Sequence, residues 1–301
     1  MAIEMVFVSL AAVAAAPAVE PQCRNSVFEE LIEEGLAVAP DGGKKLALPR
    51  PSMPEGASAA EQRKIIAELP GNRPYDDMVR NAIVAPFAMR IEEVENPAGD
   101  PLRRVDVWFI AYGRLPQFFD ERQAASLVQW AATDKKSSVG AVLSADDLRR
   151  LSIVPAAGNR VREQFIFRQG VLFDRVRVGA TYRVMTTLEP NAVVIAAVID
   201  SRFNEDEKYP NYWQSIPESG EPAVRQKYVT AGAYCKVSPL LEPKGAIFVE
   251  QHFLFAEPQG WFRGAPLLRS KLPLAIQDSV RQLRRQLRTG ADASSEPVEG
   301  K

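Results

Sequence analysis

Alternating apolar and polar residues predict an antiparallel hairpin in the first half of the chain. From residue 83 to residue 94, IVAPFAMRIEEV has an apolar side chain at every second position. After the turn sequence ENPAGDP, the run RRVDVWFIAYG alternates again, with Val105, Val107 and Phe109 on one face. Successive side chains of a strand point to opposite faces, so each run has one apolar face. Two such runs joined by a turn predict a β-hairpin.

Further apolar runs predict the remaining strands. In chain order they are VREQFIFRQG, VRVGATYRVMTTLEP, NAVVIAAVID, KYVTAGAYCKVSPLL and GAIFVEQHFLFAEP. The run over residues 191–200 is apolar on both faces. Such a strand must be covered on both sides, so we expect it at the centre of the sheet.

Capping signals predict the helices. Short helices are expected to begin at Ser26, Ser58, Asp120 and Ser144, because each is followed three residues later by an acid or an amide. A long amphipathic helix is predicted over residues 267–289, where apolar residues recur at helical spacing. Gly290 is expected to end it. Strands and helices in this order predict an α+β fold.

The pattern divides the chain into four parts. Residues 1–18 resemble a signal peptide, because MVFVSLAAVAAAPA is an uncharged apolar run and Ala16-Pro17-Ala18 fits the small-x-small cleavage rule. Residues 19–57 form a short helix and a strap rich in Pro and Gly, residues 58–290 a single α+β domain, and residues 291–301 a disordered tail. We therefore expect export, with cleavage near Ala18, to the periplasm, the cell envelope or the medium. Glu4, and the lack of Lys or Arg before the apolar run, do not fit the usual signal-peptide pattern.

The order of elements from residue 58 to residue 289 resembles the START-type helix-grip superfamily. That resemblance implies a curved antiparallel sheet packed around the long C-terminal helix, with a cavity between them for a lipid or another apolar ligand. Separately, LALPRPSMPEGASAAEQRKII resembles a segment of exported bacterial proteins of unknown function. Neither resemblance carries over a functional residue.

Aromatic residues in two turn-rich segments are the candidate ligand or partner contacts. The loop over residues 200–222 contains Tyr209, Tyr212 and Trp213, and PQGWFRGAP contains Trp261 and Phe262. The loop is a self-packed cluster, a lid at a cavity mouth, or a partner-facing patch, and the sequence leaves all three open. Gln251 is a further candidate, because it interrupts the apolar face of its strand.

Catalytic and metal-binding motifs are absent from the sequence. The only histidine, His252, is either a general base oriented by Glu250 or a histidine on a partly exposed sheet face. One histidine and no C-x-x-C motif exclude the common zinc sites. The chain also lacks G-x-S-x-G, S-x-x-K and the phosphate-binding glycine motifs. We expect no cofactor and no metal.

Charge and length narrow the choice of partners. The 37 Lys and Arg residues nearly balance the 38 Asp and Glu residues, so no global field indicates a nucleic-acid partner. No run is long and apolar enough for a transmembrane span. The C-terminal helix is basic on its polar side at Arg281, Arg284, Arg285 and Arg288. These charges favour a helix C-terminus, or they meet an anionic surface such as phospholipid headgroups or an acidic envelope polymer.

Three functions follow from these observations. The leading hypothesis is an exported, non-catalytic protein that binds an apolar or lipid-like ligand between the sheet and the last helix. The second is an envelope interaction or assembly protein that docks on a protein or polymer through the aromatic loop and the basic helix. The third is an enzyme with a dispersed site. In an oxidising compartment Cys23 and Cys235 are candidates for a disulfide.

Overall fold

A computed structural model describes residues 24–38, 43–96, 99–119, 139–217, 223–259, 261–262 and 267–292. Its elements in chain order are α1 (Ser26–Glu29), η1 (Glu30–Glu34), β1 (Leu36–Ala37), β2 (Lys45–Leu46), α2 (Ala59–Ala67), α3 (Tyr75–Met78), β3 (Phe87–Val94), β4 (Leu102–Tyr112), η2 (Leu115–Phe119), β5 (Val139–Val142), α5 (Ala145–Arg150), β6 (Val161–Leu172), β7 (Val176–Glu189), β8 (Ala192–Ile199), η3 (Ser201–Phe203), β9 (Tyr212–Ser215), β10 (Gln226–Lys227), β11 (Ala231–Pro239), β12 (Ala246–Ala256) and α6 (Leu267–Asp292). The predicted signal peptide, the helix expected at Asp120 and Cys23 lie outside the described residues.

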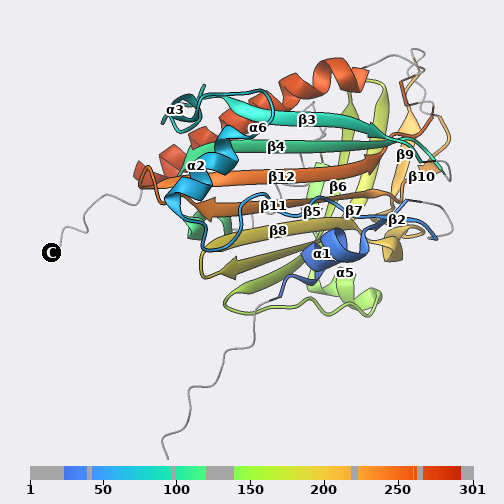
Figure 1. Cartoon of the computed structure of the whole chain (residues 1–301). Coiled ribbons are helices and arrows are strands. Elements are labelled where there is room, and N and C mark those ends of the chain that lie inside the picture. The colour runs from blue at the N-terminus through green and yellow to red at the C-terminus, as the bar shows by residue number, and fades with distance from the viewer. Residues whose placement is uncertain are drawn as a thin grey trace, which may run out of the picture.

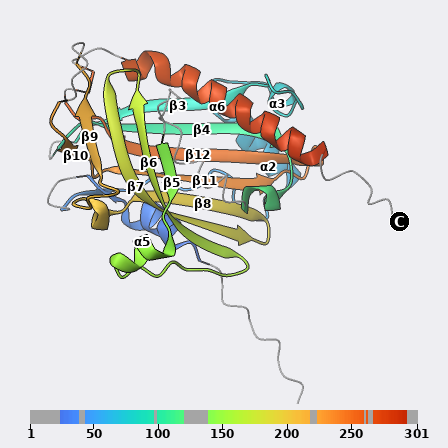
Figure 2. The same cartoon turned by 180° about the vertical axis from the view of Figure 1, so that it is seen from behind.

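Ten of these strands form one open antiparallel sheet. Its main path runs β10-β9-β7-β8-β11-β12-β4-β3, and β5 and β6 branch from β7. Along one edge β7 pairs with β6, and along the other it pairs first with β9 and then with β8. The sheet therefore splits at β7, and β6 and β7 cross the direction of β4 and β12 (Figure 2). The central position predicted for residues 191–200 is confirmed, because β8 lies between β7 and β11.

The sheet has a different cover on each face. The helix face carries Val107, Cys235 and Gln251, which share one side of β4, β11 and β12 by their register, and α6 lies across it. The strap face carries Trp108, Glu250 and His252, and it is covered by α1, α2 and the strap between them (Figure 1). The predicted α+β fold, with a large antiparallel sheet and a long C-terminal helix packed on it, is confirmed.

Local sequence explains most helix ends. Ser58 and Glu61 form a complete capping box at α2, and Ser144 and Asp147 form another at α5, as predicted. At α1 the prediction was wrong by one residue, because the side chain of Asn25 rather than Ser26 accepts the capping hydrogen bond, from the Phe28 N–H. Asn25 is anchored there by bonds from its Nδ2 to the carbonyls of Met185 and Val194.

Two predicted boundaries are corrected by tertiary contacts. The first strand was expected to begin near Ile83, but β3 begins at Phe87, because the carbonyls of residues 83, 85 and 86 turn toward Arg284. The last helix was expected to end at Gly290, but α6 extends to Asp292. Its buried residues Leu268, Leu272, Ile276, Val280 and Leu287 join the main apolar core on the helix face, as the predicted stripe requires.

Candidate functional site

Aromatic side chains from distant segments meet at one end of the helix face. Trp213 on β9 and Trp261 in the turn before α6 lie with ring centroids 6.4 Å apart. Tyr228 contacts Trp261 at 5.5 Å, and Phe262 contacts both Trp261, at 5.9 Å, and Phe173, at 5.8 Å. We call these five residues the aromatic cluster. The structure thus brings together three of the predicted contact residues, namely Trp213, Trp261 and Phe262.

The aromatic cluster contains a hydrogen-bond donor that has no acceptor among the described residues. Trp261 is only 3% exposed, and its indole Nε1 has no hydrogen-bond partner among the described residues. A buried indole N–H normally finds a partner, and leaving it without one costs about 1–3 kcal/mol. The position is therefore suited to a ligand or a water molecule that offers an acceptor.

Tyr182 is a polar side chain near the aromatic cluster. Tyr182 pairs with Ile166 and Ile199 across the neighbouring strands, which places it on the helix face. It lies close enough to Tyr228 for a charge on its phenol to raise the pKa of Tyr228. Burial raises the pKa of Tyr182 above its ordinary value, although its side chain keeps part of its accessible surface. Tyr182 therefore adds a partly exposed phenol to this end of the helix face.

Gln251 lies on the same face, in the middle of the sheet. Its backbone neighbours across the strands are Val107 and Cys235, and its Nε2 lies 3.9 Å from the Cys235 Sγ. Its side chain is half-buried, whereas those of Val107 and Cys235 are buried. Among the described residues this amide has a weak sulfur acceptor as its one side-chain partner, so it can bind a polar group of a ligand on this largely apolar face.

The other two predicted aromatic residues are held within the loop and its supports. Tyr212 is buried over Gly179, where a Cβ would come within 2.4 Å of its ring, and its hydroxyl donates to Gln169. Tyr209 packs against Phe167. These contacts match the self-packed alternative for the described part of the loop and leave Trp213 alone to face the aromatic cluster.

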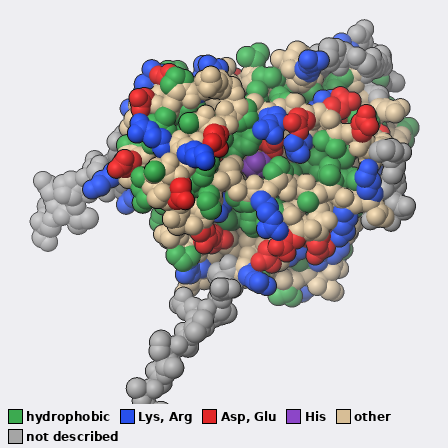
Figure 3. Space-filling view, in the orientation of Figure 1, with side chains coloured by type: hydrophobic (Ala, Val, Ile, Leu, Met, Phe, Trp, Pro, Cys, Tyr) green, Lys and Arg blue, Asp and Glu red, His purple; other side chains and the backbone are tan. Residues whose placement is uncertain are grey.

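A second group of functional side chains lies on the strap face. The Nδ1 of His252 donates a 2.7 Å hydrogen bond to the Asp106 carboxylate, and its Nε2 lies 3.7 Å from the Glu250 Oε2. All three side chains are at most 2% exposed. In Figure 3 the single histidine shows only a small area on this face. The partly exposed position considered for His252 is therefore wrong, because the strap covers it.

Glu250 is the residue that connects this ionic cluster to the strap. Its Oε2 accepts hydrogen bonds from the Ser52 N–H at 2.7 Å and from the Ser52 hydroxyl at 2.9 Å. The Ser52 hydroxyl in turn accepts from the Trp108 indole at 2.9 Å. Tyr234, whose ring packs on His252, donates to the Pro49 carbonyl at 2.7 Å. The cluster thus fastens the strap to three central strands.

The electrostatics of the cluster favour a charged histidine. Burial lowers the pKa of His252, but the hydrogen bond to Asp106 and the negative charges of Asp106 and Glu250 outweigh burial, so its pKa is raised. Arg104 lies 3.4 Å from the second Asp106 oxygen and adds a positive charge. The Nε2 of His252 has no hydrogen-bond partner among the described residues. This arrangement favours an imidazolium paired with two carboxylates, and its Nε2 makes no hydrogen bond with a described residue.

Sequence reasoning identified part of each site. Glu250 was expected beside His252, because the two residues share one strand face, and this is what the structure shows. Asp106, Tyr182 and Tyr228 were missed. Asp106 stands opposite His252 only because of the register between β4 and β12, which alternation alone does not determine.

Cys235 lies on the helix face as a buried free thiol, and burial raises its pKa to about 12. Its proposed pairing with Cys23 stays a prediction. In the described part of the chain no helix has the length and apolarity to span a membrane, and no group of three or more metal-ligating side chains is suitably placed.

Comparisons with known proteins find similar structures but no family related by sequence. No family model matches the chain, and no curated protein is significantly similar in sequence. Among solved structures, the human StarD13 (DLC2) lipid transfer and protein localization domain is 8% identical, with 66% of this chain and 89% of that chain covered at a TM-score of 0.35. Human STARD10 is 6% identical, with 67% and 78% covered and a TM-score of 0.30. A protein from Arthrobacter aurescens is 10% identical, with 70% and 98% covered and a TM-score of 0.31. The strand pairing and element order of the chain itself establish the large open antiparallel sheet and the long C-terminal helix.

Proposed function

We propose that the protein is an exported, non-catalytic binding protein for an apolar ligand that carries a hydrogen-bond acceptor. The ligand lies between the helix face and α6, at the end where the aromatic cluster stands. The main support is the Trp261 indole N–H, which is buried in aromatic surroundings without an acceptor among the described residues. Apolar walls with a few placed polar groups are typical of small-molecule sites.

Tyr182 and Gln251 support the same assignment. Both are partly accessible side chains on an otherwise apolar face, and both carry polar groups. Together with Trp261 they offer donors to one apolar molecule. The sequence-based expectation of a signal peptide is the reason for proposing export.

Co-purification is the first test of this proposal. Native mass spectrometry and solvent extraction of the purified protein should find a bound apolar molecule. Binding of Nile red, a neutral fluorophore with a carbonyl acceptor, then gives an affinity that variants can change. Replacing the indole donor in Trp261→Phe should weaken Nile red binding roughly fivefold, because one hydrogen bond contributes about 1 kcal/mol.

Trp108→Phe is the matched control. It also removes one buried indole N–H, but on the strap face, where that group donates to Ser52. We expect it to lower stability and leave Nile red affinity unchanged. Equal affinities for Trp261→Phe and the wild type, together with no co-purifying molecule, would contradict the proposal.

The docking hypothesis has less support from the described residues. Tyr212 is buried and Trp213 contacts Trp261, so neither is a free aromatic contact for a partner. Pull-down of an envelope protein or polymer that is lost in a Trp213→Ala variant would favour docking instead.

A further inference from the structure

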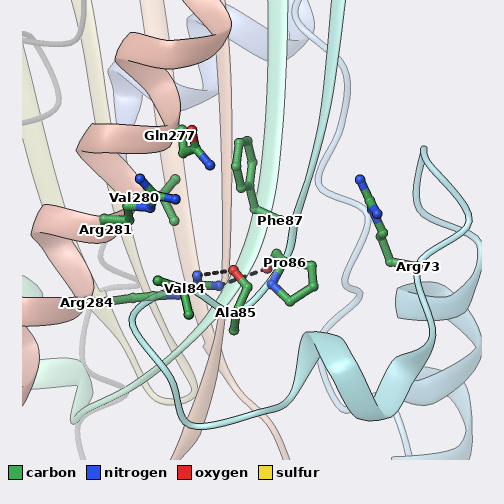
Figure 4. A pocket seen from close by; sticks show the side chains of 9 residues that line it. All are labelled: Arg73, Val84, Ala85, Pro86, Phe87, Gln277, Val280, Arg281 and Arg284. Atoms are coloured by element: carbon green, nitrogen blue, oxygen red, sulfur yellow. Dashed lines mark hydrogen bonds between the residues drawn. The ribbon is translucent and has the colours of Figure 1, made fainter.

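A pocket of about 210 Å³ lies between α6 and the segment that leads into β3. Its polar lining consists of Arg73, Gln277, Arg281 and Arg284, and the described residues around it include neither Asp nor Glu. Figure 4 shows three of these residues on α6 and Arg73 on the segment opposite the helix. Phe87, at the start of β3, provides an apolar wall. The pocket is thus a positively charged cleft with one aromatic side.

Arg284 forms the deepest part of this lining. It is 4% exposed, and its Nε donates to the Ile110 carbonyl at 2.9 Å. Its two Nη groups donate to the carbonyls of Ile83, Ala85 and Pro86. A guanidinium has five N–H donors, so these four bonds leave one hydrogen on Nη2. In the described part of the chain its charge is balanced by backbone dipoles and by the Phe109 ring, whose centroid lies 5.6 Å from its Cζ, and by no carboxylate.

The other two arginines are also weakly compensated. Arg281 lies 3.8 Å from Asp278, whose side chain is largely exposed. Arg73 makes no hydrogen bond or ion pair with another described residue and is exposed. Burial lowers the pKa of Arg284 to about 10, which reflects the cost of keeping this cation away from water. An anion in the pocket would offset that cost in a space that all three arginines line.

We propose that this pocket binds a phosphate group, either as a free small phosphate compound or as the headgroup of a phospholipid. Guanidinium forks match the oxygens of phosphate in bidentate geometry. Three cations around one site favour a dianion over a singly charged carboxylate. The volume lies below the roughly 300–1,000 Å³ of pockets for drug-sized ligands, which suits a small group. The site shares no residue with the aromatic cluster and is independent of the proposed function.

Calorimetric titration of the full chain with inorganic phosphate tests the site. Arg281→Gln and Arg73→Gln should each raise the dissociation constant about tenfold, because each removes a charge-assisted contact. Arg269→Gln is the matched control, since Arg269 is an exposed arginine on the same helix but outside the pocket. It should leave phosphate affinity unchanged. Arg284 is kept, because its bonds hold the segment before β3.

Equal weakening by Arg281→Gln and Arg269→Gln would overturn the proposal, because nonspecific screening would then explain the binding. Heat signals from chloride that equal those from phosphate at matched ionic strength would overturn it too. Titration with dihexanoyl phosphatidic acid separates the two sources: tighter binding than inorganic phosphate assigns a phospholipid headgroup, and equal or weaker binding assigns a free phosphate compound. Nile red binding should not change in Arg281→Gln, so failure here and failure of the proposed function can be told apart.

Discussion

Glu250, Gln251 and His252 are consecutive residues of β12, yet they lie in opposite environments. Glu250 and His252 face the strap, are almost fully buried and belong to a bonded ionic cluster. Gln251 lies on the face that α6 covers, stays partly accessible, and its amide contacts the Cys235 sulfur as its one side-chain partner among the described residues. The polar groups of the strap face are used to attach a covering segment. Those of the helix face, which include the Trp261 N–H, are left available. The strap face is not fully satisfied either, because the Nε2 of His252 has no hydrogen-bond partner among the described residues, but there the covering strap leaves no room for a ligand to be inferred.

The largest effect should come from removing one charge of the ionic cluster. Glu250→Gln should lower the free energy of unfolding by about 3–5 kcal/mol, because it leaves a buried imidazolium and strap donors without their anion. Urea unfolding measures it. Gln251→Leu, one residue away on the helix face, should change stability by less than about 1 kcal/mol. Similar losses in both variants would show that the two faces do not differ in this way.

Stability should also depend on pH through His252. Because its folded-state pKa is raised, its contribution is fully present below the unfolded pKa of about 6.5 and is lost as pH rises through the folded pKa. The melting temperature should therefore fall over that interval above pH 6.5. A His252→Asn variant should lack this component of the profile. If the variant and the wild type had identical pH profiles, protonation of His252 would not contribute to the stability of the cluster.

A smaller loss is expected from one strap hydrogen bond. Tyr234→Phe removes the donor to the Pro49 carbonyl and should cost about 1 kcal/mol. Limited proteolysis of the strap should become faster in parallel. Tyr75→Phe removes a similar 2.7 Å bond, to the Glu242 carbonyl at the exposed end of the molecule. We expect it to leave the rate of strap cleavage unchanged, and an equal acceleration would argue against specific anchoring.

The smallest effect on stability is predicted for Cys235 on the helix face. This prediction is tested by the reactivity of the thiol rather than by unfolding. With a pKa of about 12, Cys235 should be nearly inert to a disulfide reagent at pH 8 in the folded protein and should react after urea unfolding. Peptide mapping without reductant reports whether Cys23 and Cys235 are joined. Rapid labelling of Cys235 in the folded state would mean that the helix face is open to solvent there.

Local patterns predicted the fold better than the sites. Capping boxes at Ser58 and Ser144, the hairpin before residue 112 and the apolar stripe of α6 each depend on neighbouring residues, so the sequence reveals them. The meeting of Trp213 with Trp261 was not predictable, since it depends on where β9 and the turn before α6 lie in space.

The arginines of the C-terminal helix show the same limit of local patterns. Arg284 was grouped with Arg281, Arg285 and Arg288 on the polar side of the predicted helix. The structure buries it instead, because four backbone carbonyls before β3 and at the end of β4 converge on its guanidinium. Periodicity assigns a face, but only the surrounding chain determines which residue of that face is covered.

The strap bonds have a consequence for the order of folding. Ser52 and Glu250 are 198 residues apart in the chain, and the Tyr234 contact to Pro49 spans 185 residues. The strap leaves the ribosome early. The Glu250 carboxylate that accepts its hydrogen bonds is in place only after β12 has been synthesised and paired with β4. Until then the N-terminal part of the chain lacks its docking surface and stays accessible. Such an arrangement favours slow closure, because distant segments must meet before their contacts stabilise either one.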